Sequence, residues 1–116
     1  MTEPAMERKA LLEYLDNDPQ LLKEVVGIFL ADCPGRIAEL RTAVTAHDSN
    51  QIARGSHALL GSLATFGAKR AVEAARELES IGRQGEMEGV DEAFCALERE
   101  FALVTFFLEK VAKDSD

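Results

Sequence analysis

The residues from 90 to 111, VDEAFCALEREFALVTFFLEKV, carry the clearest structural pattern in the chain. Apolar side chains recur there at alternating steps of four and three, which places them on one face of an α-helix. Such a stripe suits a helix that lies nearly parallel to its neighbours in an antiparallel bundle, although a coiled-coil dimer could use it too. Phenylalanines at several core positions favour the bundle. The stripe consists of Val90, Phe94, Leu97, Phe101, Val104, Leu108 and Val111.

The remainder of the chain also repeats at three and four residues, and no run alternates at two, so an all-α domain is predicted. Asp18 followed by Pro19 is typical of a helix start, with an N-cap acceptor and a proline in the first helical position. We expect this helix to run to about Cys33, because Pro34 should bend or restart the chain. An apolar stripe then continues as far as His47 and is formed by Ile37, Leu40 and Val44.

Two further helices are expected between this stripe and residue 90. Asp48 should cap the first of them, and Gln51, three residues later, completes a capping-box pattern. That helix should end near Phe66, with Gly67 as its terminator. The second helix should stop at the loop from 82 to 89, and it carries a seam of mostly small side chains formed by Ala68, Ala71, Ala75 and Leu78.

These patterns predict an antiparallel four-helix bundle with a short extra N-terminal helix, from Arg8 to Tyr14, in a single domain that spans residues 1–116. A chain of 116 residues can bury roughly two-thirds of its unfolded surface, enough to fold without disulfides or a metal. The predicted connections are short, so consecutive helices should be antiparallel neighbours. We expect the protein to be a monomer.

Charge and apolar pattern argue against nucleic acid and membranes as partners. Lysine and arginine number 13 and aspartate and glutamate 21, which gives a net charge of −8 and argues against binding to nucleic acid phosphates. No apolar run approaches the roughly 20 residues of a membrane span. The amino terminus lacks the cationic and apolar regions of a signal peptide. We therefore expect a cytoplasmic protein that binds neither nucleic acid nor membrane.

Cysteine usage fits the same location. Cys33 and Cys95 each sit alone in an apolar helical pattern, and two cysteines are too few for a disulfide framework. We interpret both as buried, reduced thiols. The initiating Met1 and the polar tail at 113–116 favour a free-standing protein over a piece cut from a larger kinase.

One residue suited to chemistry falls outside the core face of the helix predicted at 50–66. On a helical wheel with about 100° per residue, His57 lies roughly 140° from Ile52. Its neighbours at helical spacing include Ala53, Gly61 and Ala64. Their small side chains would line the bottom of a shallow area that contains the imidazole. The core face itself is expected to consist of Ile52, Ser56, Leu59, Leu60, Leu63 and Phe66.

Gly61 needs a physical reason, because glycine inside a helix costs about 1 kcal/mol relative to alanine. The missing side chain, one turn from His57, would let another molecule's backbone or a phosphoryl group approach the imidazole. Alternatively, Gly61 permits close packing of a neighbouring helix, and His57 is an ordinary solvated surface residue. Spacing alone leaves both interpretations open.

The motifs around His57 resemble a known family. Ser56-His57-Ala58-Leu59-Leu60-Gly61-Ser62, then Phe66-Gly67-Ala68, and Leu78-Glu79 followed by Gly82-Arg83 are similar to the sequence pattern of histidine-containing phosphotransfer (HPt) domains. The similarity extends to Phe29-Leu30-Ala31-Asp32, Leu40 and Asp48, and covers the chain from about Leu15 to Val111. Any one of these pieces alone is weak, whereas the combination is fairly specific.

The resemblance implies a four-helix bundle in which His57 is the phosphorylated residue. It implies a phosphorelay intermediate that accepts a phosphoryl group from a receiver-domain aspartate of a hybrid sensor kinase and passes it to a response-regulator receiver. Imidazole has an ordinary pKa of about 6.5, so much of it is an uncharged nucleophile at neutral pH. No cofactor of its own is expected, because the Mg²⁺ that neutralises the transferring charge would belong to the partner receiver. The protein is thus expected to be a phosphoryl carrier and not an enzyme.

Two positions depart from the family pattern. Ser56 stands where alanine is common, and Leu60 stands where lysine is common. In related domains the lysine lies beside the histidine and can interact with the phosphoryl group or the receiver. Arg54, three residues before His57, and Lys69 or Arg70, at the start of the following helix, are candidate substitutes for the missing charge.

The departure at Leu60 keeps a second function open, in which an HPt-like bundle docks receivers without carrying phosphate. A third is a homodimeric adaptor built on the stripe at 90–111. For docking we expect a modest apolar patch with a polar rim around the histidine. The candidate docking or phosphate-proximal residues are Ala53, Arg54, Leu60, Gly61, Ala64, Lys69 and Arg70.

No metal or nucleotide site is expected. His47 lies at the end of an apolar stripe, next to a predicted helix C-terminus, where a partly charged imidazole meets the carboxyl end of the helix dipole. His47, His57 and the two cysteines show no recognisable metal-ligand spacing. The chain also lacks a glycine-rich phosphate loop, so we expect no ATP binding and no self-phosphorylation.

Overall fold

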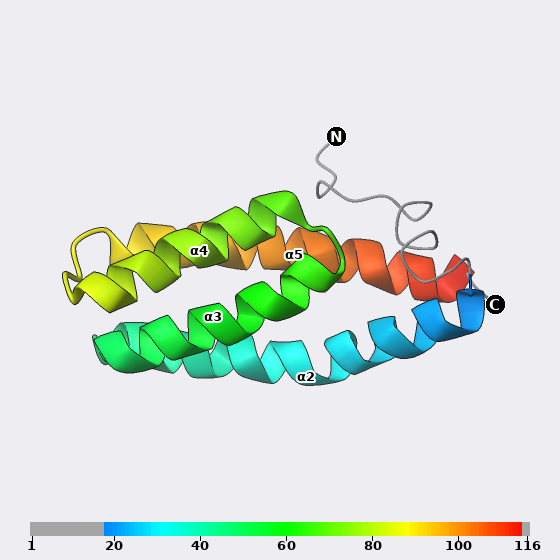
Figure 1. Ribbon diagram of the computed structural model, residues 1–116, viewed down its shortest axis with the longest axis horizontal. Coiled ribbons are helices and arrows are strands. Elements are labelled where there is room, and N and C mark those ends of the chain that lie inside the picture. The colour runs from blue at the N-terminus through cyan, green and yellow to red at the C-terminus, as the bar shows by residue number, and fades with distance from the viewer. Residues whose placement is uncertain (1–17, 115–116) are drawn as a thin grey trace.

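Four antiparallel helices form a closed bundle in the computed structural model, which describes residues 18–114 (Figure 1). They are α2 (Pro19–Thr45), α3 (Ser49–Thr65), α4 (Lys69–Gln84) and α5 (Val90–Asp114). Each helix packs against two others, in the ring α2–α3–α4–α5. The all-α four-helix bundle is therefore confirmed, whereas the short helix expected from Arg8 to Tyr14 lies outside the described residues.

The helices differ in length in a way that shapes the molecule. Helices α2 and α5 lie next to each other and run well past the shorter pair α3 and α4, which cover one part of their length (Figure 1). Within the described range, no helix is long and apolar enough to cross a membrane.

The predicted N-caps Asp18 and Asp48 are confirmed, but the amide of Asp48 donates to the carbonyl of Ala43 and not to the Gln51 side chain as in a capping box. The Asp18 carboxylate accepts hydrogen bonds from the backbone amides of Gln20 and Leu21, at 3.0 and 3.1 Å. The Asp48 carboxylate accepts one from the Gln51 amide at 3.2 Å. These acceptors satisfy amides that have no partner within the first turn of a helix.

Two tight turns set the antiparallel order of α2, α3 and α4. After α2, the amides of His47 and Asp48 reach back to the carbonyls of Val44 and Ala43, at 3.1 and 3.0 Å. The same hydrogen bonds follow α3. Each turn contains one residue in the left-handed conformation, which is His47 in the first turn, with φ of 53°, and Gly67 in the second, with φ of 66°. This is the Schellman geometry, which reverses the chain within a few residues.

Helix α2 corrects the expectation at Pro34. The helix does not end near Cys33 but continues through Pro34 to Thr45. Proline removes one backbone hydrogen bond from a helix interior. Here Cys33 and Ile37 are buried on either side of the exposed Pro34, so core packing holds both halves of the helix in place.

The predicted core stripe of α5 is confirmed, since all seven of its residues are buried within the single chain. The stripe therefore packs against α2 and α4 of the same chain, and its interpretation as a coiled-coil dimer seam is wrong. Cys33 is buried as expected, and burial raises the pKa of its thiol. Cys95, in contrast, is exposed, because it follows the buried Phe94 by one residue and so points about 100° away from the stripe.

Helix α4 runs past the predicted loop start at Gly82 and ends at Gln84, with Gly85 in the left-handed conformation at φ of 76°. Gly82 is buried against α3. A Cβ atom built on Gly82 would lie 2.6 Å from the backbone nitrogen of Ala53 and 2.9 Å from the carbonyl oxygen of Ser49. The two helices thus touch backbone to backbone at this point, which only glycine allows.

Replacing Ser56 with alanine is expected to raise the free energy of unfolding by about 1–2 kcal/mol. Ser56 is 0% exposed, and its hydroxyl has no hydrogen-bond partner among residues 18–114. A buried unpaired hydroxyl destabilises the folded state, and alanine is the better helix former. Urea denaturation gives the comparison, with Ser80→Ala on the exposed side of α4 as the control for a serine whose hydroxyl has a partner, since it accepts a hydrogen bond from Gln84 Nε2 at 3.3 Å. Equal effects of the two substitutions would contradict the argument.

Candidate functional site

The candidate site is centred on His57, which lies on the outward side of α3. Its side chain is 68% exposed, and its Nδ1 atom lies 3.1 Å from Oε2 of Glu79 on α4. The backbone contact between Gly82 and Ala53 explains this pairing. Because α3 and α4 are antiparallel, one turn from that contact along each helix leads to His57 on α3 and to Glu79 on α4.

Glu79 is a buried carboxylate, and Arg83 balances its negative charge. Arg83 lies one turn later on α4 and donates from Nε and Nη2 to Oε2 of Glu79, at 2.9 and 2.6 Å. Burial by itself raises the pKa of Glu79. The hydrogen bonds and charge of Arg83, together with His57, outweigh burial and hold the pKa of Glu79 below its ordinary value. Glu79 is therefore ionised near neutral pH.

An ionised carboxylate decides which nitrogen of the neutral imidazole carries hydrogen. A carboxylate can only accept hydrogen bonds, so the Nδ1 atom of His57 must be the donor to Glu79. In the neutral ring, Nε2 then keeps its lone pair. The arrangement presents one free nucleophilic nitrogen on an exposed ring whose other nitrogen is held in place.

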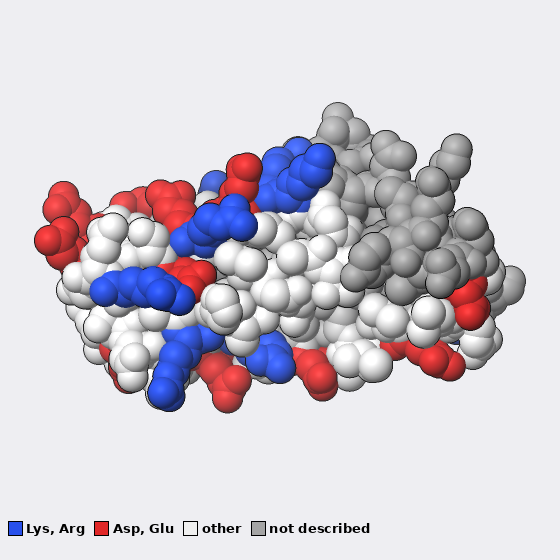
Figure 2. Space-filling view, viewed as in Figure 1, with Lys and Arg blue, Asp and Glu red and all other residues white. Residues whose placement is uncertain are grey.

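A shallow hollow lies beside the ring. It is lined by small side chains and by two arginines, Arg54 from α3 and Arg83 from α4. Figure 2 shows cationic side chains gathered over the face that α3 and α4 present, whereas acidic side chains mark the end where α4 leads into α5. The residues lining the hollow are Asn50, Ala53, Arg54, His57, Ala58 and Arg83.

Several predicted site residues lie around His57. Ala53 and Arg54 line the hollow. Gly61 and Ala64 are exposed further along α3, and a Cβ atom built on Gly61 would meet nothing within 4 Å. The interpretation of Gly61 as a packing glycine is therefore wrong. Leu60 is partly buried and packs against the hydrophobic core.

Lys69 and Arg70 do not come close to His57. They lie in the first turn of α4, and Glu79, which contacts His57, lies two to three turns later. Lys69 and Arg70 are therefore roughly 14–15 Å from Glu79 along the helix axis. Arg70 instead forms an ion pair with Glu100 on α5, with 3.2 Å between Nε and Oε1. The structure places Arg83, and not these two residues, beside the imidazole.

Sequence reasoning did not identify Glu79 and Arg83 as site residues. Both belong to the Leu78-Glu79 and Gly82-Arg83 pieces of the family pattern, and their spacing of four is that of a helical ion pair. An acidic residue on the buried side of α4 was the signal that could have found them, since a buried carboxylate requires partners.

His47 has no part in this site. It is exposed in the turn between α2 and α3. Among residues 18–114 there is no group of three or more histidine, cysteine or acidic side chains arranged to hold a metal ion.

Comparisons with known proteins agree with the fold. The family model described as Hpt domain matches residues 24–105. The fold is similar to the crystal structure of histidine-containing phosphotransfer protein B (HptB) from Pseudomonas aeruginosa PAO1, with a TM-score of 0.87 and 22% sequence identity over 97% of this chain and 98% of that chain. No curated protein matches the sequence. Hpt domains carry phosphoryl groups in two-component phosphorelays. The chain therefore belongs to the Hpt domain family and has a histidine phosphotransfer role.

Proposed function

We propose that this chain is a phosphorelay intermediate whose His57 accepts a phosphoryl group from a receiver-domain aspartate of a hybrid sensor kinase. It then passes the group to the receiver domain of a response regulator. The observation that carries the proposal is the exposed His57 ring, held through Nδ1 by buried Glu79 so that Nε2 is open to a partner.

The transfer step requires no proton movement in this chain. The lone pair of His57 Nε2 attacks the phosphorus atom of the aspartyl phosphate, and a nitrogen–phosphorus bond forms as the bond from phosphorus to the aspartyl oxygen breaks. The electron pair leaves with the aspartate carboxylate. The phosphorylated ring keeps hydrogen on Nδ1 and gains positive charge, which the neighbouring Glu79 carboxylate stabilises. The reverse sequence delivers the group to the second receiver.

The remaining requirements belong to the partner. The carrier binds the receiver and orients its imidazole, while the Mg²⁺ that balances charge on the transferring group is expected in the acidic pocket of the receiver. Two arginines beside the ring, Arg54 and Arg83, supply cationic charge near His57, where Leu60 replaces the usual lysine. This local charge favours a carrier over a module that only docks.

Phosphotransfer profiling tests the proposal directly. Purified, phosphorylated receiver domains are mixed with the protein, and transfer of labelled phosphate is followed over time. We expect rapid labelling by a cognate receiver and return of the label to a second receiver. Label should be lost in acid, because a phosphoramidate hydrolyses readily there. Binding of receivers without any transfer would support the docking function instead. Sedimentation of the same preparation tests the expected monomer.

Gly61→Gln is expected to slow transfer from a receiver at least tenfold while changing stability by no more than about 1 kcal/mol. Gly61 is exposed one turn from His57, and a Cβ atom built on it meets nothing within 4 Å, so a side chain there has room in the isolated protein. The same side chain would obstruct a receiver that approaches the imidazole. Transfer kinetics and urea denaturation measure the two effects. Unchanged transfer would mean that receivers do not approach over Gly61.

A further inference from the structure

One oxygen atom of Glu79 accepts hydrogen bonds from two directions. Oε2 lies 3.1 Å from Nδ1 of His57, and it also accepts from Nε and Nη2 of Arg83, at 2.9 and 2.6 Å. The imidazole and the guanidinium therefore share the same negative charge. Of the two, Arg83 makes the shorter and more numerous contacts.

This sharing affects the reactivity of the ring. A carboxylate beside an imidazole stabilises the protonated, cationic ring, which has no lone pair for attack. Glu79 alone would therefore orient His57 and at the same time favour its inactive form. A permanently charged guanidinium on the same oxygen weakens that second effect while leaving the hydrogen bond to Nδ1 in place.

We propose that Arg83 is a positioning residue that acts through Glu79: by sharing the carboxylate oxygen with His57, it weakens the stabilisation that Glu79 gives to the protonated, unreactive ring. This inference rests on the proposed function, because it assumes that His57 accepts the phosphoryl group. It assigns Arg83 an effect on the pH dependence of the reaction and no contact with the transferring group.

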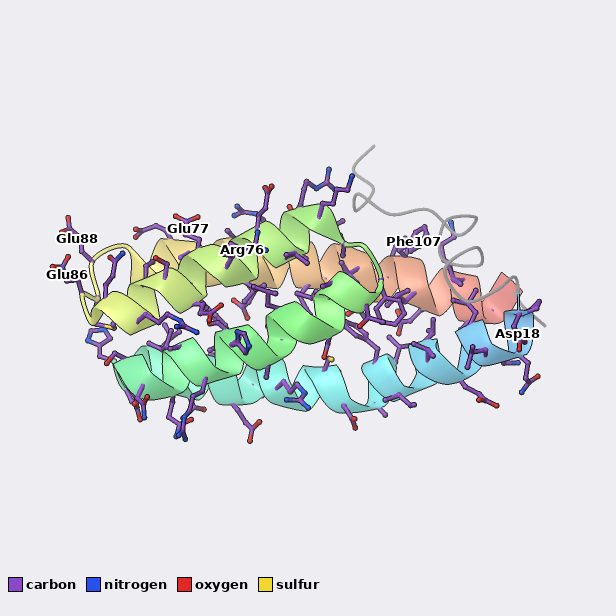
Figure 3. All side chains as sticks on the ribbon, viewed as in Figure 1. Asp18, Arg76, Glu77, Glu86, Glu88 and Phe107 are labelled. Carbon is purple, nitrogen blue, oxygen red and sulfur yellow. The ribbon has the colours of Figure 1, made fainter. Side chains whose placement is uncertain are left out.

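The other charged groups near His57 are few among the described residues. Arg54 lies three residues earlier on α3 and lines the hollow, and Arg76 is exposed one turn before Glu79 on α4. On α4 and the loop after it, Glu77, Glu86 and Glu88 point away from α3 (Figure 3). The charged groups of α2 near α3 line two other hollows. Arg36 and Asp32 line one of them, and Arg36 and Glu39 line the other. Among residues 18–114, Glu79 alone forms a hydrogen bond with the imidazole.

Arg83→Gln tests the inference with phosphoramidate, a small phosphoryl donor that needs no partner protein. Labelling rates of variant and wild type are compared as a ratio at each pH, which removes the pH dependence of the donor itself. Without Arg83 beside Glu79, the pH below which labelling becomes slow should rise by about one unit. We expect labelling about fivefold slower than wild type near pH 6.5 and within about twofold near pH 8.5.

Three variants make the result specific. Arg76→Gln removes one exposed cation from the same side of α4 without touching Glu79, and should leave the ratio near one at every pH. Arg83→Lys keeps a cation and should restore most of the rate near pH 6.5. In a Glu79→Gln background there is no carboxylate to shield, so adding Arg83→Gln should have no pH-dependent effect.

Two outcomes would overturn the inference. An Arg83→Gln deficit that is equal at all pH values, or one that persists in the Glu79→Gln background, would mean that Arg83 acts on the phosphoryl group or on stability. Failure of the proposed function looks different, because the wild-type protein would then remain unlabelled, or His57→Gln would still be labelled. Circular dichroism of each variant shows that the helices are retained.

Discussion

His57→Gln is expected to abolish phosphoryl labelling of the chain completely while leaving the helical bundle folded. The glutamine amide has no nucleophilic lone pair that can form a stable bond to phosphorus. The His57 side chain is 68% exposed and contributes one hydrogen bond, to Glu79, which keeps Arg83 as a partner after the substitution. The free energy of unfolding should therefore change by no more than about 1 kcal/mol. Labelling by phosphoramidate or a phosphorylated receiver, together with urea denaturation, measures both effects.

The second histidine of the chain provides the matched control. His47→Asn should be labelled at the wild-type rate, because His47 lies in the turn between α2 and α3 and does not line the hollow at His57. Asparagine tolerates the left-handed conformation at this position better than most residues. Label that survives His57→Gln, or that resists acid, would place the phosphoryl group on another side chain and refute the proposed function.

Gly82→Ala is expected to destabilise the bundle by about 2–3 kcal/mol. The new methyl group would lie 2.6 Å from the backbone nitrogen of Ala53 and 2.9 Å from the carbonyl oxygen of Ser49. Neither backbone atom can move aside as a flexible side chain would, so α3 and α4 must separate. The loss exceeds the roughly 1 kcal/mol that alanine gains over glycine as a helix former. Urea or thermal denaturation followed by circular dichroism gives the magnitude.

Gly61→Ala isolates the helix-preference effect within the same bundle. Gly61 also lies inside a helix, but a methyl group there meets nothing within 4 Å. It should therefore raise the free energy of unfolding by up to about 1 kcal/mol. The two substitutions are chemically identical and are expected to have opposite signs. If Gly82→Ala were also stabilising, the backbone contact between α3 and α4 would not exist in solution.

The difference between these two glycines shows how far a sequence can be interpreted. Both lie inside helices. Spacing alone left open whether Gly61 packs against a neighbour, and it gave no indication that Gly82 does. We expected a loop to begin at Gly82, because glycine often ends a helix, whereas α4 continues to Gln84. Which face of α4 meets α3 depends on the tertiary arrangement, and no local pattern around a glycine contains that information.

The bundle itself was predictable because its signals are local and repeated. The apolar stripe of α5 and the caps at Asp18 and Asp48 follow from periodicity and from backbone hydrogen bonding. Pro34 was misleading, because the rule that proline ends a helix considers only the backbone. Burial of Cys33 and Ile37 on both sides outweighs the single lost hydrogen bond.

The candidate site was predictable only in part, for a related reason. The outward position of His57 follows from the phase of one helix, so a helical wheel is sufficient to find it. Its partners Glu79 and Arg83 come from a different helix, and their contact depends on how α3 and α4 are aligned. The same limit explains why Lys69 and Arg70, which are nearer in sequence, are farther away in space.

The open position of the imidazole has a kinetic consequence for signalling. On the proposed function, a donor and an acceptor receiver would occupy the same surface in turn, because the exposed ring of His57 is held through Nδ1 on one side of the bundle. Each cycle would then include the departure of the first partner before the second can bind. Among related complexes, differences in affinity arise mostly from the dissociation rate. A receiver that bound this face very tightly would hold the carrier and lower the flux of phosphoryl groups. Short-lived complexes are therefore the arrangement that serves this carrier best.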